Sequence, residues 1–287
     1  MKNIIEIKNL TKRYDSNFQL DISKLNIPSG RIIGLIGENG AGKTTLIKCL
    51  LNLVKVDKGS IKIFDKDIVS DEAIIKENIG IVLDGMFLPE VLTAKDVDSI
   101  MKDIYKSWDS SEFFRLVTDF QIPLNKKIKE LSKGMRKKLE IASALSHNAK
   151  LLILDEATSG LDPVVRDEIL DLLLKFVKDD EHSILLSTHI TSELEYISDN
   201  IIFIDNGKIV LEDSRDNIME NYGLLKCDVD YLENIDKEDV IAYKKNKYDC
   251  HVLINNVSKI RRKYKDVIID KITIQDLMVL MIKGERK

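Results

Sequence analysis

The residues with the clearest chemistry lie between Gly37 and Thr44, where the chain reads Gly-Glu-Asn-Gly-Ala-Gly-Lys-Thr. A glycine, four residues and then Gly-Lys-Thr is the spacing of a phosphate-binding loop. Its glycines allow a tight turn whose backbone N–H groups point at phosphate oxygens. The Lys43 ammonium can reach the outer phosphates, and the Thr44 hydroxyl can enter a magnesium shell. The run therefore predicts a site for a nucleoside triphosphate and Mg²⁺.

Further polar residues follow two apolar segments. Leu151–Leu154 leads into Asp155 and Glu156, and His189 comes shortly after the apolar run that ends at Ser187. The carboxyl ends of parallel strands share one edge of a sheet, where ligands bind in such folds. Asp155 can hold Mg²⁺, and Glu156 can accept a proton from an attacking water. We expect these side chains to lie near the phosphate loop.

The segments that carry these residues alternate between strand and helix patterns. Period-two alternation predicts strands over residues 4–14 and 18–22, and another strand at 61–64. Apolar runs predict buried strands at residues 32–36, 78–84, 151–154, 183–187 and 200–204. Between these strands, helices are expected from Thr45 and over residues 164–177. Such alternation indicates a mostly parallel sheet with helices on both faces. From residue 92 to 145 the pattern is helical, with Ser132 as a candidate N-cap.

Composition narrows the setting. The chain has 287 residues, with 44 Lys+Arg against 48 Asp+Glu, so no strong positive field recruits nucleic acid. Its three cysteines show no Cys-x-x-Cys spacing, which argues against a zinc site or a disulfide framework. No apolar run reaches the length of about 20 residues that spans a bilayer. We therefore expect a cytoplasmic protein whose membrane role, if it has one, depends on a partner.

Taken in order, these motifs resemble the nucleotide-binding subunit of an ATP-binding cassette (ABC) transporter. The resemblance covers residues 1–213, about three quarters of the chain, and implies an α/β P-loop NTPase of ABC type. That fold has a mostly parallel core sheet, an antiparallel β part and a helical subdomain, expected here at about 92–146. Residues 214–287 are then a small C-terminal α/β appendage, either a packing module that steadies a dimer or a ligand sensor.

The resemblance also implies a role for each motif residue. Tyr14 would stack on the adenine of ATP, Asp155 would support Mg²⁺, Glu156 would be the general base and His189 would contact the γ-phosphate. The triphosphate would be held by Gly37, Asn39, Gly40, Ala41, Gly42, Lys43, Thr44 and Thr45. In the family, a signature helix presents its N-terminus to ATP bound on the opposite subunit, a role that falls here on Ser132 and Gly134. The implied partners are a second ATPase subunit, identical or different, and a polytopic membrane-spanning subunit.

Two departures from the family pattern matter. The signature is usually Leu-Ser-Gly-Gly-Gln, whereas residues 131–135 read Leu-Ser-Lys-Gly-Met. Ser132 and Gly134 are kept, so we expect activity to survive. In the family, the strand ending at Leu83 usually leads to a glutamine that joins the metal site and senses the membrane partner. This chain has Asp84 there, which could reach Mg²⁺ through water or change how the nucleotide state is reported. An acidic residue there is similar to ATPases of bacterial exporters of antibiotics and antimicrobial peptides.

The predicted function is the ATP-hydrolysing motor of a membrane exporter, peripheral at the inner face of the cell membrane. One alternative is an ABC ATPase of translation or DNA repair that has no membrane partner. Such translation factors usually carry two cassettes and such repair proteins carry long coiled coils, whereas this chain has one phosphate loop and no sustained heptads. A second alternative, the ATPase of an importer, differs mainly in its membrane partner.

In the last 74 residues, the sequence predicts strands but no catalytic group. Leu225, Cys227, Val229 and Tyr231 alternate with polar residues, as do the apolar residues of 250–254. Helices are expected from about Val257 to Tyr264 and after a capping box at Thr273-x-x-Asp276.

Overall fold

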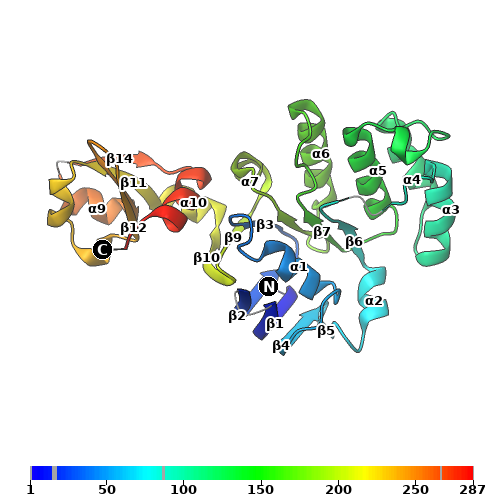
Figure 1. The fold of residues 1–287 in the computed structure, drawn as a ribbon, viewed down its shortest axis with the longest axis horizontal. Coiled ribbons are helices and arrows are strands. Elements are labelled where there is room, and N and C mark those ends of the chain that lie inside the picture. Colours follow the sequence, from blue (N-terminus) through cyan, green and yellow to red (C-terminus); the bar gives the residue numbers. More distant parts are fainter. Residues whose placement is uncertain (1, 15–17, 86–87, 266, 287) are drawn as a thin grey trace.

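A computed structural model of the protein describes residues 2–14, 18–85, 88–265 and 267–286. Three parts lie in a row in Figure 1: a β-rich C-terminal part at the left, an α/β core in the centre and a group of helices at the right. No helix in the described ranges is both long and apolar enough to cross a lipid bilayer.

The core is a six-stranded sheet in the order β10-β9-β3-β8-β7-β6. Its strands are β3 (Ile32–Ile36), β6 (Ile79–Val82), β7 (Leu151–Asp155), β8 (Ser183–Ser187), β9 (Asn200–Asp205) and β10 (Lys208–Ser214). Five strands run parallel, and only the edge strand β10 is antiparallel to its neighbour. β3, β7 and β8 are buried along their whole length, which explains their continuous apolar sequences. The parallel sheet predicted from the sequence is confirmed, although β10 was not predicted.

This strand order decides where the chemistry lies. β8 sits between β3 and β7, so the segments that leave these three strands emerge side by side at one edge of the sheet. They are the phosphate loop, the Asp155–Glu156 pair and the Thr188–His189 pair. Three helices follow these segments: α1 (Lys43–Leu50), α6 (Pro163–Phe176) and α7 (Thr191–Ile197). α1 begins two residues before the expected Thr45, so Lys43 and Thr44 lie in its first turn.

A four-stranded antiparallel sheet covers α1, as Figure 1 shows below the core. Its strands are β1 (Asn3–Tyr14), β2 (Phe18–Pro28), β4 (Lys58–Ile63) and β5 (Lys66–Asp67), in the order β2-β1-β4-β5. The alternating isoleucines and leucines of β1 and β2 point into one hydrophobic cluster with Leu46, Ile47 and Leu50 of α1. The alternation in the sequence thus reflects a sheet with one buried face.

The helices at the right of Figure 1 come from the stretch predicted to be helical. They are α3 (Ala94–Ile104), α4 (Ser110–Asp119) and α5 (Lys133–Leu145), while α2 (Glu72–Glu77) precedes them beside the core. α3 to α5 enclose their own cluster around Phe113, Leu116 and Leu139. As expected, the Ser132 hydroxyl caps α5 by accepting the Met135 backbone N–H at 3.2 Å. Whether residues 92–146 form a separate subdomain stays a prediction.

The C-terminal part contains a third sheet, in the order β12-β13-β11-β14. Its elements are α8 (Arg215–Asn221), β11 (Tyr222–Cys227), β12 (Ala242–Lys245), β13 (Cys250–Asn255), α9 (Val257–Lys263), β14 (Ile268–Lys271) and α10 (Ile274–Lys283). The helices predicted after Asn256 and Thr273 are confirmed, including both bonds of the Thr273 capping box. The strand expected to reach Tyr231 ends at Cys227 instead, because the chain turns into a 3₁₀ helix at Asp230–Asn234.

One face of this C-terminal sheet belongs to the same hydrophobic cluster as the core. Leu277 and Leu280 of α10 pack in that cluster with Leu194 and Ile197 of α7. In addition, the Ile274 N–H donates to the Glu195 carboxylate at 2.7 Å. The part after residue 214 is therefore firmly attached to the helix that follows His189. A domain boundary at residues 213 and 214 remains a prediction.

Candidate active site

The phosphate loop joins β3 to α1 through backbone that only glycine tolerates. Gly42 is the N-cap of α1 with a φ of +116°, a region that L side chains rarely adopt. A Cβ on Gly37 would lie 2.3 Å from the Ile204 carbonyl oxygen, so the loop can approach β9 only with glycine there. These constraints leave the N–H groups at the start of α1 without intrahelical partners and give them the dipole of the helix. The loop is thus built to bind an anion.

Lys43 supplies a cation to this loop. Its ammonium donates to the carbonyl oxygens of Gly37 at 2.7 Å and Glu38 at 3.3 Å, and the residue is buried. Burial lowers the pKa of Lys43, while the nearby charges of Glu156 and Asp155 oppose that shift. A partly desolvated ammonium that donates to neutral carbonyls can exchange them for phosphate oxygens with a strong electrostatic gain.

Thr44 and Asp155 form the part of the site that fits a divalent cation. The Thr44 hydroxyl donates to Oδ2 of Asp155 at 2.8 Å. Asp155 is buried, and its Oδ1 has no hydrogen-bond partner among the described residues. A buried carboxylate oxygen without a partner is rare in native proteins and calls for a ligand. Hard oxygen atoms from a hydroxyl and a carboxylate are suited to Mg²⁺, so these residues fit the metal predicted from the sequence.

Glu156 and His189 meet in front of the loop. Nδ1 of His189 lies 2.6 Å from Oε2 of Glu156, although the residues are 33 positions apart. Glu156 has a left-handed backbone with a φ of +51°, and its N–H donates to the Ser187 carbonyl oxygen at 2.9 Å. A strained conformation of a non-glycine residue often marks a functional site. With its proton on Nδ1, His189 donates to the carboxylate, which fixes the ring and leaves Nε2 available to a ligand.

A cleft of about 560 Å³ brings most of the predicted residues together. Asp155 lies behind this cleft through its bond to Thr44. Ser159, in a polar turn shortly after Glu156, also lines the cleft, as does Phe18, which the sequence had not singled out as a site residue. The complete lining is Phe18, Glu38, Asn39, Gly40, Gly42, Lys43, Thr44, Thr45, Asp84, Glu156, Ser159 and His189. The side chains therefore surround a single volume large enough for a triphosphate.

Tyr14 does not line this cleft. It ends β1, is partly exposed, and carries the Lys12 ammonium 5.4 Å from its ring centroid. Phe18 is the aromatic residue of the cleft wall, with Cζ 3.1 Å from the position that a Gly42 Cβ would take. Residues 15–17, which join these two aromatics, lie outside the described ranges. Adenine stacking by Tyr14 stays a prediction.

Ser132 and Gly134 are not brought into the cleft of the same chain. They line a separate groove between α4, α5 and α6, together with Lys133, Met135 and Gly160. The first turn of α5 therefore does not share the cleft of the phosphate loop of its own chain.

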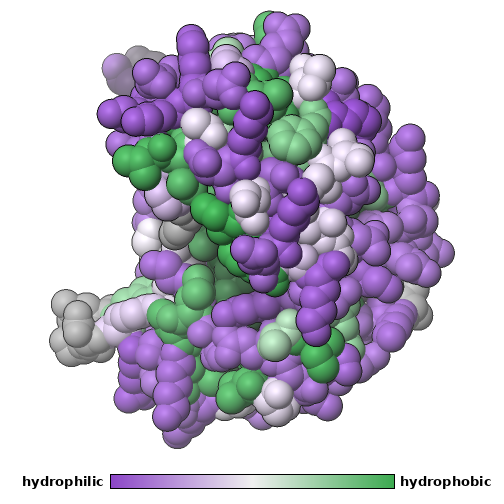
Figure 2. Space-filling model, turned by 90° about the vertical axis from the view of Figure 1, so that its right-hand side faces the viewer, coloured by the Kyte–Doolittle hydropathy of each residue, from purple (hydrophilic) through white to green (hydrophobic). Residues whose placement is uncertain are grey.

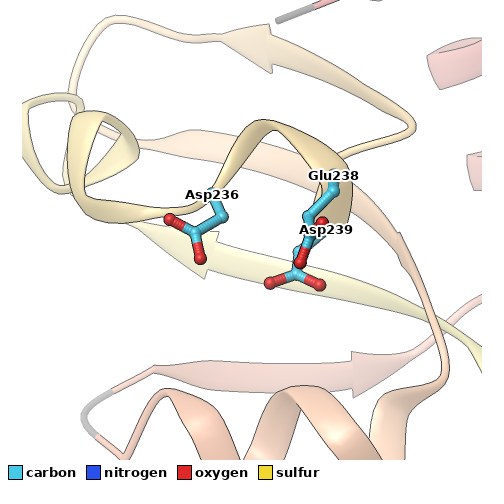
Figure 3. Close-up of side chains that lie close together, drawn as sticks. All are labelled: Asp236, Glu238 and Asp239. Carbon is cyan, nitrogen blue, oxygen red and sulfur yellow. The ribbon is translucent and has the colours of Figure 1, made fainter.

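A second group of carboxylates lies in the C-terminal part, and Figure 3 shows Asp236, Glu238 and Asp239 close together. Lys259 donates to Asp239 at 3.0 Å, as does the Tyr264 hydroxyl, and Lys263 forms ion pairs with Asp239 and Asp236. Burial alone would raise the pKa of Asp239, but hydrogen bonds from Lys263, Lys259 and Tyr264 lower it to about 2. Side chains of the protein thus already neutralise this group, which is unlike the open oxygen of Asp155.

Comparison with known proteins agrees with this geometry. Residues 20–159 match the family model described as ABC transporter. The chain is 34% identical over 256 residues to the bacitracin transport ATP-binding protein BcrA of Bacillus licheniformis. The matched residues make up 88% of this chain and 81% of BcrA. It is 38% identical over 224 residues to the lantibiotic transport ATP-binding protein SrtF of Streptococcus pyogenes, covering 76% of this chain and 95% of SrtF.

The fold agrees as well. A solved structure described as the ATP binding subunit of an ABC transporter superposes with a TM-score of 0.67 at 27% identity, covering 75% of this chain and 91% of that one. This confirms the fold class predicted from the sequence, with its parallel core and antiparallel β part. The chain belongs to the ABC transporter family, and it is an ATP-binding, ATP-hydrolysing subunit of such a transporter.

Proposed function

We propose that two such subunits close around ATP and that their closure drives export through a membrane-spanning partner. The observation that carries this proposal is the separation of Ser132 and Gly134 from the phosphate loop of their own chain. The first turn of α5 offers backbone N–H groups and a helix dipole to an anion. A second ATPase subunit, identical or different, would bring its bound phosphates to this turn.

Within each site, the residues at the sheet edge have separate roles in binding and hydrolysing ATP. The loop N–H groups and Lys43 hold the phosphates, and His189 contacts the γ-phosphate through Nε2. Thr44 and Asp155 would hold Mg²⁺, which would supply charge stabilisation at the phosphates. Glu156 accepts the proton of the attacking water, and its contact with His189 at 2.6 Å supports the assignment of both residues.

Asp84 links this site to the helical part. It follows β6, lines the cleft, and is one residue from Leu83, whose carbonyl oxygen accepts from the Lys137 ammonium at 3.2 Å. Lys137 belongs to α5, so a shift of that helix is transmitted to the segment that carries Asp84. We infer that Asp84 would help to hold Mg²⁺ and would report the nucleotide state to α5.

An apolar groove supports a protein partner. It lies next to the segment that carries Asp84 and is lined by Leu51, Leu53, Ile81, Val82, Leu83, Leu88 and Met101, with Lys76, Glu140 and Ser143. On the side of the molecule drawn in Figure 2, hydrophobic side chains gather around a hollow in a mostly hydrophilic face. An exposed apolar groove favours a protein contact. The proposed occupant is a cytoplasmic segment of the membrane subunit, which would hold this chain at the inner face of the membrane.

The proposed cargo is an antibiotic or an antimicrobial peptide. Support comes from relatives that are a bacitracin transport protein and a lantibiotic transport protein. Cells that produce this chain with its membrane subunit should become less susceptible to bacitracin or lantibiotics, and Lys43→Ala should abolish the protection. Copurification of a polytopic membrane protein tests the partner. Equal susceptibility of all these strains to every compound contradicts the proposed cargo.

The shared site is tested by complementation between two inactive variants. Ser132→Arg places bulk at the first turn of α5 and should block closure, whereas Lys43→Ala should weaken ATP binding. In a mixed homodimer one site carries both changes and the other carries neither. Mixing the variants should therefore restore part of the ATP hydrolysis, provided that one intact site suffices.

A matched control keeps this test specific. Ser214 caps α8 by accepting the Asn217 N–H at 3.1 Å, so Ser214→Arg makes the same change at another helix. It should leave hydrolysis unchanged. Cysteines at positions 39 and 132, with native cysteines replaced, should crosslink between chains when ATP is present. Crosslinks confined to single chains contradict the shared site.

A further inference from the structure

Glu193 is a buried carboxylate that none of the roles above explains. It lies in the first turn of α7 and is 1% exposed. Nε of Arg166, on α6, lies 3.2 Å from its Oε1. Burial raises the pKa of Glu193, and the nearby charge of Glu156 raises it further. Hydrogen bonds from the hydroxyls of Thr158 and Thr188 and the charge of Arg166 oppose this rise. Glu193 is therefore packed against the residues that follow both β7 and β8.

The Glu193 carboxylate is held by three buried or half-buried side chains. Nε of Arg166 is its cationic partner at 3.2 Å, and the hydroxyls of Thr158 and Thr188 hydrogen-bond to it. A buried ion pair adds little net stability, because the desolvation of its charges offsets their attraction. The position of Glu193 between these two hydroxyls therefore requires a reason other than the stability of the fold.

The neighbours of Glu193 are the two turns that carry the catalytic pair. Thr158 comes two residues after Glu156, and Thr188 directly precedes His189. The Thr188 hydroxyl accepts the Ile190 N–H at 3.0 Å, so the second turn is itself well ordered. The contact of Glu156 with His189 at 2.6 Å requires that the distance between the two turns stay fixed. Glu193 contacts both turns, and Arg166 ties it to α6.

We propose that Glu193 is a positioning residue for ATP hydrolysis, which holds the Thr158 and Thr188 turns at the separation where Glu156 and His189 meet. This inference rests on the proposed roles of Glu156 and His189. Glu193 does not line the cleft, so its loss should change the chemical step and leave nucleotide binding intact. Small displacements of catalytic groups are known to slow chemistry strongly without changing binding.

The test replaces Glu193 with two residues of similar size. Glu193→Leu removes both oxygens without opening a large cavity, and we expect kcat for Mg²⁺-ATP to fall about 10- to 100-fold. The KM for ATP should stay within about threefold, because uniform binding is untouched. The melting temperature should fall, because Glu193→Leu leaves the Arg166 guanidinium without its partner, so kcat is expressed per folded molecule. Glu193→Gln keeps an oxygen for the two hydroxyls and should restore kcat to within about threefold of the wild type.

Two controls separate the possible failures. Arg166→Met combined with Glu193→Leu removes the charge that the single variant leaves behind, and should show the same loss of kcat at normal stability. Unchanged kcat in Glu193→Leu overturns the inference, as does a loss that follows the folded fraction or that Glu193→Gln does not rescue. Glu156→Gln is measured in parallel. If Glu156→Gln hydrolyses ATP like the wild type, the proposed function has failed instead.

Discussion

Asp239 in the C-terminal part and Asp155 at the edge of the core sheet are both buried carboxylates, but their surroundings are opposite in kind. In the C-terminal part, Asp239 receives hydrogen bonds from Lys259, Lys263 and Tyr264. At the edge of the core sheet, Asp155 accepts from the Thr44 hydroxyl with one oxygen and keeps the other without a partner among the described residues. Both carboxylates are buried, but only Asp239 is paired with cationic side chains of the protein.

The difference between these two carboxylates distinguishes a structural role from a ligand-binding role. A buried charge that is fully paired has nothing left to offer a ligand, and the loss of either partner destabilises the fold. A buried charge that is left open destabilises the chain on its own and gains its partner from the ligand. The Asp239 group therefore carries no metal-site proposal despite its three neighbouring carboxylates, whereas the pair of Thr44 and Asp155 fits Mg²⁺. The comparison predicts opposite responses to loss of charge in the two regions.

The largest effect is expected for Glu156→Gln. The amide keeps the size of the side chain but cannot accept a proton, so ATP hydrolysis should fall by about 10²- to 10⁴-fold. ATP binding should remain, because the phosphate loop is unchanged. Removal of a charge beside Asp155 and Glu193 relieves repulsion, so the melting temperature should not fall. Phosphate release and thermal unfolding measure the two properties, and turnover within a few fold of the wild type contradicts the assignment.

Much of this catalytic edge was predictable from the sequence, and the reason is local. The phosphate loop, the Asp155–Glu156 pair and His189 each follow a continuous apolar strand, and the ends of parallel strands meet at one edge. The signature helix was predictable through its Ser132 cap. Each of these features depends on a few adjacent residues, which a single sequence displays directly.

Other features depend on contacts that no local pattern encodes. The left-handed backbone of Glu156 and its contact with His189 arise only when β7 and β8 are paired. The position of Phe18 against Gly42 depends on β2 crossing the loop. In the C-terminal part, the short strand β14 pairs with the distant strand β11, and alternation misled the prediction beyond Cys227. A 3₁₀ turn can present alternating apolar residues without being a strand.

The second prediction concerns Asp239, where loss of charge should change stability and not ATP hydrolysis. Asp239→Asn should leave ATP hydrolysis unchanged but lower the free energy of unfolding at pH 7 by about 1–3 kcal/mol, the range for hydrogen bonds to charged groups. The low end is favoured because Lys259 and Lys263 are partly exposed and can return to water. Urea unfolding measures this difference. A decrease in hydrolysis at full stability would break the comparison, since it would give the Asp239 group a functional role.

Acid should remove the contribution of ionised Asp239 to the free energy of unfolding. The pKa of Asp239 is lowered from 3.8 to about 2, so its stabilisation is complete above the unfolded value and is lost as the pH falls through that interval. The wild type should therefore lose its advantage over Asp239→Asn between about pH 4 and pH 2. Because all other carboxylates titrate in both proteins, the difference between their unfolding curves isolates this residue. A constant difference across that range contradicts the role of the ionised form.

The smallest effect compares two helix caps of the same chemistry in the two regions. The Ser132 hydroxyl accepts the Met135 N–H at 3.2 Å, and the Thr273 hydroxyl accepts the Asp276 N–H at 3.0 Å. Ser132→Ala and Thr273→Ala should each cost about 0.5–2 kcal/mol of stability. Only Ser132→Ala should also reduce ATP hydrolysis, because its helix end is proposed to face the phosphates of another subunit. Thr273→Ala serves as the matched control, since it removes a cap of similar strength from α10. Thermal unfolding and ATP hydrolysis, measured on both variants, decide the matter. If both variants keep full activity in proportion to their folded fraction, the Ser132 hydroxyl is only a cap, and any contact with ATP must come from the backbone of α5.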